Sequence, residues 1–338
     1  IYQERFWNMR GRIIRGIAGF YYVAPVPAEE DGMPQTAAGR ENEAGVQRGS
    51  LPEAARGVLQ EVLRPADDLY ECRAKGIFRK DGKKPLPGDY VEFDITSEEE
   101  KEGNVSRILP RSSALIRPAV ANVDQALIIM AAVSPQPNLN LMDRFLVTME
   151  QQGIACCICF NKKDLADEKT CAVLFDSYRT SGYPVVFTSA VTGEGMPELQ
   201  ALLEGRTTTV AGPSGVGKSS LINELQDGVS MQTGEISRIE RGRHTTRHSE
   251  LIRIRRGTWI VDTPGFSSIE LFDMEKEELG DYFPEFRKWE PQCRFTGCAH
   301  INEPDCGVKE ALLQGEISRS RYENYCQLYG ELKDRRKY

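Results

Sequence analysis

The sequence predicts an α/β fold in which a domain with a phosphate-binding loop lies between a small β-barrel and a cysteine-rich, mainly helical region. Three observations support this prediction. A glycine-rich loop at residues 212–219 lies between a strand-like run and a helix-like run, and a second nucleotide motif at residues 161–164 precedes it. Short β-like runs fill residues 9–109. Three cysteines and one histidine cluster within residues 293–306.

The chain of 338 residues is too long for one typical core, and its composition favours three domains. The first, residues 9–109, reads as a β-barrel with candidate strands at residues 12–23, 69–74, 88–94 and 103–109. Basic residues gather on one of its loop regions and indicate either a nucleic-acid-binding face or a solvated charged hairpin. They are Arg73, Lys75, Arg79, Lys80, Lys83 and Lys84.

Residues 24–68 interrupt this barrel. The segment is rich in Pro, Gly, Ala and Glu and poor in aromatic residues, so it cannot bury enough apolar surface to offset the cost of ordering. We expect a flexible surface insertion. Residues 53–64 are an exception, because Val58, Leu59, Val62 and Leu63 fall on one helical face and favour a short docked helix.

The second domain, residues 112–284, begins with a buried strand at residues 122–133 and a helix at residues 139–152. A further apolar run at residues 155–160 ends in Asn161-Lys162-Lys163-Asp164. Open α/β sheets bind ligands at such strand ends. Asp164 can accept hydrogen bonds from guanine N1–H and the 2-amino group, a donor pair that adenine lacks. Asn161 would tie the loop together, and the stem of Lys162 would cover the base.

Ser189 and Ala190 follow another strand-like run, residues 184–187. Small residues at this point fit the loop that offers a backbone N–H to the guanine carbonyl. By itself this signal is weak, and its value comes from its position relative to the other two motifs.

The phosphate loop matches the pattern G-x-x-x-x-G-K-[ST]. Its residues are Gly212, Pro213, Ser214, Gly215, Val216, Gly217, Lys218 and Ser219, and Ser220 continues into the helix. Glycines allow backbone N–H groups to turn toward phosphates, and the helix N-terminus adds the positive end of its dipole. Lys218 can reach the β and γ phosphates, and the Ser219 hydroxyl can ligate Mg²⁺. Because most GTPases carry this loop before the base-reading motif, the reversed order indicates a circularly permuted GTP-binding domain.

A third strand-like run, residues 258–261, leads into Asp262 of a D-x-x-G sequence. After a phosphate loop, this carboxylate is placed to hold Mg²⁺ through water on the γ-phosphate side. Residues 238–248 between the two motifs are polar and lack apolar periodicity, as expected of a mobile switch. Either Thr245 or Thr246 could complete the Mg²⁺ shell, and the sequence leaves this choice open.

The third domain, residues 285–338, opens with a metal-binding pattern. Cys293, Cys298, His300 and Cys306 supply three thiolates and one imidazole in a loop-like context. This is a closed tetrahedral set suited to one structural Zn²⁺, with no open position for catalysis. The strand cysteines Cys156, Cys157 and Cys159 read instead as small buried core residues. Helices are expected at residues 309–313 and 318–328.

The motif order, the switch residues 242–246 and the cysteine cluster together resemble the RsgA family, also called YjeQ or YloQ, of circularly permuted bacterial GTPases. The resemblance covers nearly the whole chain apart from residues 24–68. It implies an OB-fold for the barrel and hydrolysis of GTP to GDP, stimulated by the 30S ribosomal subunit and coupled to its late maturation, with 16S rRNA as a contact. The alternative is a nucleotide-gated rRNA-binding scaffold in which hydrolysis is incidental. We expect a monomer, although the sequence leaves the oligomeric state open.

The hydrolytic step is the least defined part of this reading. Phe266 stands where many GTPases carry a water-orienting Gln, and a phenyl ring cannot position a nucleophile. His244 in the switch is the candidate for that role, and the alternative is that it contacts RNA or caps the loop. Slow intrinsic turnover with stimulation by a partner is therefore expected.

Charge and cysteine content bear on the partners and the compartment. The net charge of −7 is the wrong sign for a simple polyanion binder, but residues 24–68 carry four Arg and nine acidic residues and so hold most of the excess. Elsewhere basic residues gather in the barrel, the switch, residues 253–256 and the C-terminal tail, which could form a one-sided RNA-facing surface. Nine cysteines, no signal peptide and no membrane-spanning run favour a reduced, cytoplasmic protein without a membrane partner.

Overall fold

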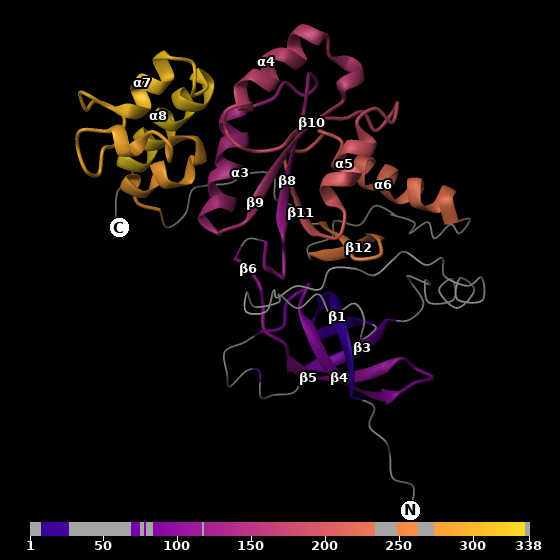
Figure 1. Cartoon of the computed structure of the whole chain (residues 1–338). Helices are drawn as coiled ribbons and strands as arrows, with labels where there is room; N and C mark the ends of the chain where they lie inside the picture. Colours follow the sequence, from indigo (N-terminus) through magenta and orange to yellow (C-terminus); the bar gives the residue numbers. More distant parts are fainter. Residues whose placement is uncertain are drawn as a thin grey trace, which may run out of the picture. The chain divides into compact units, whose positions relative to one another are not determined.

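The computed structural model describes residues 8–26, 69–74, 78, 84–116, 118–233, 249–262 and 274–334. These residues divide into two compact units. The first holds the N-terminal part of the chain up to Asn122, together with residues 249–253, and the second holds residues 123–233 and everything described after residue 253. Figure 1 labels the elements of both units.

Five strands close into a barrel in the first unit: β1 (Asn8–Ile17), β2 (Phe20–Pro25), β3 (Tyr70–Ala74), β4 (Tyr90–Ser97) and β5 (Glu102–Ile108). Their order is β1-β2-β3-β5-β4, and β4 pairs back with β1. Inward-facing residues of every strand, among them Ile13, Val23 and Phe93, form one core. The OB-like barrel predicted for this region is therefore confirmed. A short hairpin, β6 (Ala114–Leu115) with β7 (Val120–Ala121), completes the unit.

The run at residues 12–23, predicted as a single strand, is a hairpin in the structure. β1 ends at Ile17 and β2 begins at Phe20, with Ala18 (φ 51°) and Gly19 (φ 90°) in the left-handed region between them. Two residues with positive φ form the tight turn that matches strand twist, but Ala rarely adopts this conformation, so the sequence signal is weak. β2 also continues through Pro25, two residues into the predicted insertion. Most of that insertion, including the predicted helix, lies outside the described residues.

A parallel sheet forms the centre of the second unit. Its strands are β8 (Gln125–Ala131), β9 (Ala155–Asn161), β10 (Val185–Phe187), β11 (Thr207–Ala211) and β13 (Thr258–Asp262), which follows β12 (Glu250–Arg255). The sheet order is β10-β9-β8-β11-β13, and every pairing among these strands is parallel. β8 is buried along its whole length, as expected of a central strand covered on both faces. The C-terminal ends of β9, β10, β11 and β13 therefore lie at one edge of the sheet.

Helices cover both faces of this sheet. They are α3 (Leu139–Gln151), η2 (Lys163–Leu165), α4 (Glu168–Tyr178), α5 (Met196–Leu203) and α6 (Lys218–Thr233). In Figure 1, α3 and α4 lie on the side nearer α8, and α5 lies on the other. Asn138 caps α3 and Asp167 caps α4 through their side-chain oxygens, which fixes where each helix begins.

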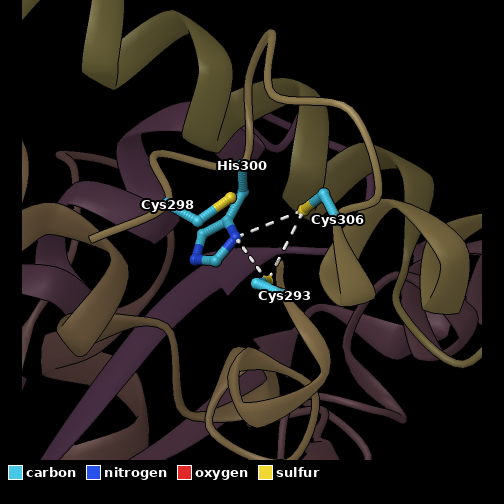
Figure 2. A group of neighbouring side chains, drawn as sticks. All are labelled: Cys293, Cys298, His300 and Cys306. Atoms are coloured by element: carbon cyan, nitrogen blue, oxygen red, sulfur yellow. Dashed lines mark hydrogen bonds between the residues drawn. The ribbon is translucent and has the colours of Figure 1, made fainter. Parts of the chain in front are cut away.

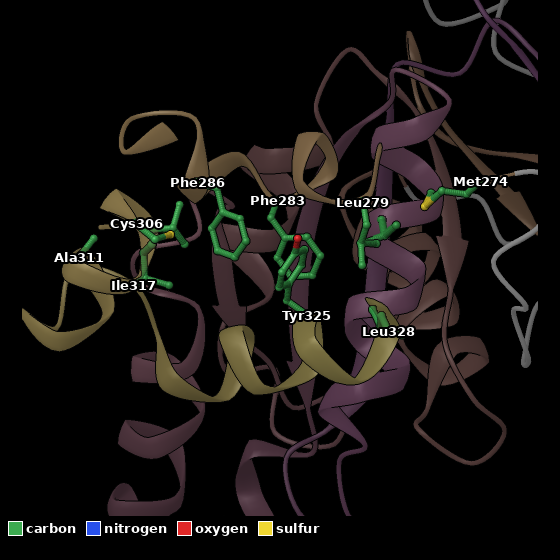
Figure 3. Close-up of a cluster of buried hydrophobic side chains, with 11 residues drawn as sticks. Met274, Leu279, Phe283, Phe286, Cys306, Ala311, Ile317, Tyr325 and Leu328 are labelled. Atoms are coloured by element: carbon green, nitrogen blue, oxygen red, sulfur yellow. The ribbon is translucent and has the colours of Figure 1, made fainter. Parts of the chain in front are cut away.

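The C-terminal region packs against α3 in the same unit. It consists of η3 (Lys276–Tyr282), η4 (Pro284–Phe286), η5 (Glu290–Gln292), α7 (Gly307–Leu313) and α8 (Arg319–Asp334). The ring centroids of Phe283, Phe286 and Tyr325 lie 5.0 to 5.2 Å apart; the two Phe rings are stacked, and Tyr325 meets both edge-on. Figure 3 shows these rings in the core of this region. Val147 of α3 belongs to the same buried cluster. Within the part of the chain that is described, no helix is both long and apolar enough to span a bilayer.

Candidate functional site

The phosphate loop joins β11 to α6 through a backbone that only glycine fits at two points. Gly212 has φ 143°, and a Cβ atom there would lie 2.1 Å from the Ile129 carbonyl oxygen of the neighbouring strand β8. Gly217 has φ 93° immediately before α6. The loop thus runs flat over the sheet edge and delivers its last residues, including the exposed Ser219, to the helix N-terminus. This arrangement suits a bound phosphate.

Lys218 points back across this loop. Its Nζ donates to the carbonyl oxygens of Gly212 and Pro213, both at 2.7 Å. Partial burial lowers the pKa of Lys218, while the charge of Asp262 acts in the opposite direction, so the carboxylate at the end of β13 lies near this ammonium group. The two groups predicted on the γ-phosphate side therefore lie on the same side of the loop.

Residues 161–164 and 189–190, which we call the base corner, meet at the ends of β9 and β10. Asn161 is buried, and its Oδ1 accepts a hydrogen bond from the Thr188 hydroxyl at 3.2 Å. The backbone N–H of Lys163 donates to the Thr188 carbonyl at 2.9 Å. The Asp164 carboxylate accepts from the Ser189 hydroxyl at 2.6 Å. These contacts hold the two loops together as one rigid corner.

The base corner and the phosphate loop are in direct contact, although 50 or so residues separate them. Asn161 Nδ2 donates to the Val216 carbonyl at 2.9 Å. Lys162, in the left-handed region with φ 62°, donates from Nζ to the Gly215 carbonyl at 2.7 Å. A Cβ atom on Gly217 would lie 2.3 Å from Asn161 Nδ2, so the glycine is needed for this approach. The two motifs form one site.

A second candidate site lies in the C-terminal region. The thiol sulfur atoms of Cys293, Cys298 and Cys306 and a ring nitrogen of His300 all lie within 4.8 Å of one another. Figure 2 shows these four side chains pointing toward one another. His300 Nδ1 is 3.6 Å from Cys293 Sγ and 3.4 Å from Cys306 Sγ, and the two sulfur atoms are 3.9 Å apart. The loop reaches this geometry with His300 in the left-handed region at φ 57°.

These separations fit one tetrahedral metal ion. Zn–S bonds of ~2.3 Å and a Zn–N bond of ~2.0 Å place neighbouring ligand atoms roughly 3.5–3.8 Å apart. The distances among the ligand atoms of Cys293, His300 and Cys306, at 3.4, 3.6 and 3.9 Å, bracket these values, and the group that includes Cys298 lies within 4.8 Å. Three thiols and one imidazole also complete a four-coordinate shell, which leaves no position for a substrate or a reactive water. The group therefore suits a structural metal.

His300 is prepared to act as a neutral ligand through Nδ1. Burial lowers its pKa, with Glu290 opposing the shift, so the imidazole is uncharged near neutral pH. Its other nitrogen, Nε2, faces Glu290 Oε1 at 3.7 Å. A carboxylate on the nitrogen that does not bind metal is a common arrangement, because it orients the ring and raises its basicity.

Several predicted site residues lie outside the described part of the chain. They are His244, Thr245 and Thr246 of the switch, together with Phe266. Sequence reasoning also missed contacts that support the described sites. The Ser189 hydroxyl donates to Asp164, and the hydroxyl groups of Tyr322 and Tyr325 donate to backbone carbonyls of residues 293–306, which we call the metal loop. The spacing of residues in the sequence does not predict a long-range contact made by a single hydroxyl group.

Comparisons with known proteins agree with this geometry. A family model described as RsgA GTPase matches residues 108–272, and a second, the RsgA N-terminal domain, matches residues 61–105. The small ribosomal subunit biogenesis GTPase RsgA of Agathobacter rectalis is 55% identical over 331 residues, which cover 98% of this chain and 100% of the relative.

Two solved structures are similar over nearly the full length. YjeQ from Thermotoga maritima is 33% identical with a TM-score of 0.73, covering 98% of this chain and 100% of the other. YloQ, described as a circularly permuted GTPase, is 35% identical with a TM-score of 0.71 and full coverage of both chains. The predicted fold class, with its permuted order of nucleotide motifs, is thereby confirmed.

Proposed function

Because this chain belongs to the RsgA family of GTPases, we propose that it hydrolyses GTP bound between the base corner and the phosphate loop, and that this turnover serves late maturation of the small ribosomal subunit. One observation carries the assignment of the site. The hydrogen bond from Asn161 Nδ2 to the Val216 carbonyl joins a base-reading motif and a phosphate loop around the same nucleotide position. The relatives are named as GTPases, which does not favour a scaffold in which hydrolysis is incidental.

The base corner would select guanine. Asp164 accepts hydrogen bonds from N1–H and the 2-amino group, and Ser189 fixes the orientation of its carboxylate. The backbone N–H of Ala190 would donate to the guanine carbonyl, and the stem of Lys162 would cover one face of the base. Adenine would leave the Asp164 carboxylate without hydrogen-bond donors, which would strongly weaken the binding of adenine nucleotides.

The phosphate loop would bind the triphosphate through backbone N–H groups and the N-terminus of α6. Lys218 exchanges its carbonyl partners for the β and γ phosphates when the nucleotide binds. The Ser219 hydroxyl, and Asp262 through water, supply the hard oxygen donors that Mg²⁺ prefers, and Thr245 or Thr246 would complete the shell. When bound, Mg²⁺ would neutralise negative charge that develops on the phosphates during hydrolysis. His244 is the residue that we propose orients the attacking water.

The metal loop would hold Zn²⁺ as a structural ion, because three thiolates and an imidazole favour it over harder cations. The relatives are named for biogenesis of the small ribosomal subunit, and the barrel belongs to a class that binds nucleic acid. We therefore propose that the chain acts as a monomer in the cytoplasm and contacts 16S rRNA on that subunit.

The test compares turnover of GTP and ATP with and without purified 30S subunits. We expect GTP turnover to rise in the presence of the subunit and ATP turnover to stay at background.

Asp164→Asn removes one acceptor and should lower the affinity for GDP by about a hundredfold, because a charged hydrogen bond is lost and an amide donor faces the 2-amino group. Asp176→Asn, on the exposed surface of α4, is the matched control. Equal turnover of ATP, or no response to the subunit, would contradict the proposal.

The variant His244→Ala distinguishes a function that requires GTP hydrolysis from a scaffold function in which hydrolysis is incidental. Subunit-stimulated hydrolysis should be lost while the affinity for GTP is retained. If cells carrying this variant still matured their small subunits normally, hydrolysis would be incidental and the scaffold reading would hold.

A further inference from the structure

Residues 321–325 of helix α8 contact both the metal loop and helix α3. Tyr322 donates from its hydroxyl to the His300 carbonyl at 2.6 Å, and Tyr325 donates to the Ala299 carbonyl at 2.8 Å. Both acceptors belong to the metal loop, directly beside a metal ligand. The same segment carries Arg321 and Asn324, which bind Asp143 of α3.

Arg321 and Asn324 converge on one carboxylate of the nucleotide-binding domain. Arg321 Nη1 donates to Asp143 Oδ1 at 2.7 Å, and Asn324 Nδ2 donates to Asp143 Oδ2 at 2.6 Å. Arg321 also makes a two-pronged contact with Glu285, at 2.8 and 3.1 Å. Asp143 and Arg321 are at most 1% exposed. Tyr178 of α4 adds a third donor to Asp143, at 3.0 Å.

This cluster resists partial opening. One guanidinium and two carboxylates lie out of contact with water, and burial raises the pKa of the Asp143 carboxyl while its donors oppose that rise. Separating α8 from α3 would remove two of the three donors to the buried Asp143 carboxylate, Arg321 and Asn324, which is more costly than losing an exposed ion pair. Buried hydrogen bonds to Asp143 therefore join helices α3, α4 and α8.

The segments just before α3 and α4 contact or form the base corner. The loop before α3 offers the Ser134 carbonyl to Lys162 Nζ at 2.6 Å, and the same ammonium group binds the phosphate loop at Gly215. Helix α4 begins at Glu168, four residues after Asp164 in the chain. Asp143 of α3 and its donor Tyr178, the last residue of α4, therefore belong to helices whose first residues closely follow Ser134 and Asp164, respectively.

We propose that Arg321 is a positioning residue that couples the metal loop to the guanine-nucleotide site through Asp143, so that each site binds its ligand more tightly when the other is occupied. A bound metal restrains the carbonyls at residues 299 and 300, and the two tyrosines of α8 pass this restraint to Arg321 and α3. Whichever ligand binds second then meets a chain that is already partly ordered. Its binding costs less conformational entropy and is therefore tighter. The inference rests on the nucleotide site proposed above.

The test measures release of Zn²⁺ from the full-length, metal-loaded chain to a chromophoric chelator, with and without saturating GDP. GDP should slow release by roughly fivefold or more, the usual range of coupling between sites. Because linkage is reciprocal for equilibrium affinities, Zn²⁺ should also tighten GDP binding; this arm compares dissociation constants, which need not change by the same factor as the release rate. In Arg321→Met, which keeps most of the side-chain volume, the effect of GDP should vanish while GDP and Zn²⁺ still bind.

Two further variants keep the test decisive. Arg319→Met removes an exposed arginine from the same helix, where it pairs with Glu323, and should leave the coupling unchanged. If Arg321→Met fails to fold, Tyr178→Phe takes its place, because it removes one donor to Asp143 and keeps the ring; it should reduce the coupling.

A chain that binds GDP and Zn²⁺ but releases the metal at one rate regardless of GDP overturns the inference and leaves the proposed function intact. Absence of GDP binding contradicts the proposed function instead. Equal loss of coupling in Arg319→Met also overturns the inference.

Discussion

At the scale of single residues, Ser189 organises the base corner through its side chain. The sequence motif predicts a backbone contribution from this loop, and the structure adds a hydroxyl that donates to Asp164 at 2.6 Å. The same oxygen accepts from the backbone N–H groups of Val191 and Thr192, at 3.3 and 3.1 Å. Its single proton is thereby directed to Asp164, which orients the carboxylate before a base arrives.

Ser189→Ala should therefore weaken GDP binding by about tenfold, the cost of one hydrogen bond to a charged group. Binding of ADP should be unchanged, because adenine has no donors for Asp164. Fluorescence titration with both nucleotides measures the difference. Thr192→Ala removes a hydroxyl from the same loop without touching Asp164 and is the control; a loss of equal size for GDP and ADP would contradict the role of Ser189.

The metal ligands give a pH-dependent prediction. Burial raises the pKa of Cys298 to about 12, and burial also raises the pKa of Cys306, so both thiols are protonated at neutral pH before metal binds. A metal binds the thiolate, so each thiol that ionises on binding releases one proton, and the apparent affinity rises with pH. His300, with its pKa lowered by burial, adds no proton near neutral pH.

We expect the apparent affinity for Zn²⁺ to rise by roughly tenfold per pH unit for each thiol that loses its proton, over the range from about pH 6 to 8. Competition with a chromophoric chelator at several pH values measures this slope. Cys306→Ser should abolish tight binding, whereas Cys171→Ser, far along the chain on α4, should leave it unchanged. An affinity that is flat with pH would contradict binding through these thiols.

At the scale of elements, the contact between the β9 and β11 loops depends on how closely two backbones approach. Gly217→Ala would place a methyl group 2.3 Å from Asn161 Nδ2 and separate the base corner from the phosphate loop. We expect GDP affinity to fall by at least a hundredfold. Gly215→Ala is the matched control: its φ of 81° is also positive, but its added methyl group would lie 3.9 Å from the nearest atom, in Pro135. Calorimetric titration of both variants separates the clash from the backbone strain they share.

The elements also show how far sequence reasoning reaches. The helix predicted at residues 139–152 is α3 (Leu139–Gln151), and the apolar run at 155–160 is β9, because periodicity and burial agree there. α8 was predicted to end at residue 328 but extends to Asp334. Its sequence reads as polar, and nothing in it indicates that Arg321 is buried beside Asp143, since charged residues are normally exposed. Such a contact arises only when three helices meet, so a local pattern cannot predict it.

At the scale of the whole molecule, charge distribution decides whether an acidic chain can bind RNA. The net charge of −7 opposes binding in general, but much of it lies in residues 24–68. If the basic groups elsewhere neutralise rRNA phosphates, affinity for the 30S subunit should fall steeply with salt, by about 0.7 to 0.9 logarithmic units per tenfold salt for each phosphate contacted. Sedimentation with purified subunits at several salt concentrations measures the slope, and GDP affinity at the same concentrations is the control. A flat response would contradict an rRNA-facing surface.

The permuted order of the chain also changes which element follows the strand that ends at Asp262. In the usual arrangement, the strand that ends at the γ-phosphate continues into the rest of the nucleotide fold, including the base motif. Here β13 ends at Asp262, and the backbone then passes through residues 263–273 directly into η3 and the C-terminal region. A displacement of Asp262 on loss of the γ-phosphate would therefore be transmitted along the main chain to the C-terminal region first, and not to the base corner.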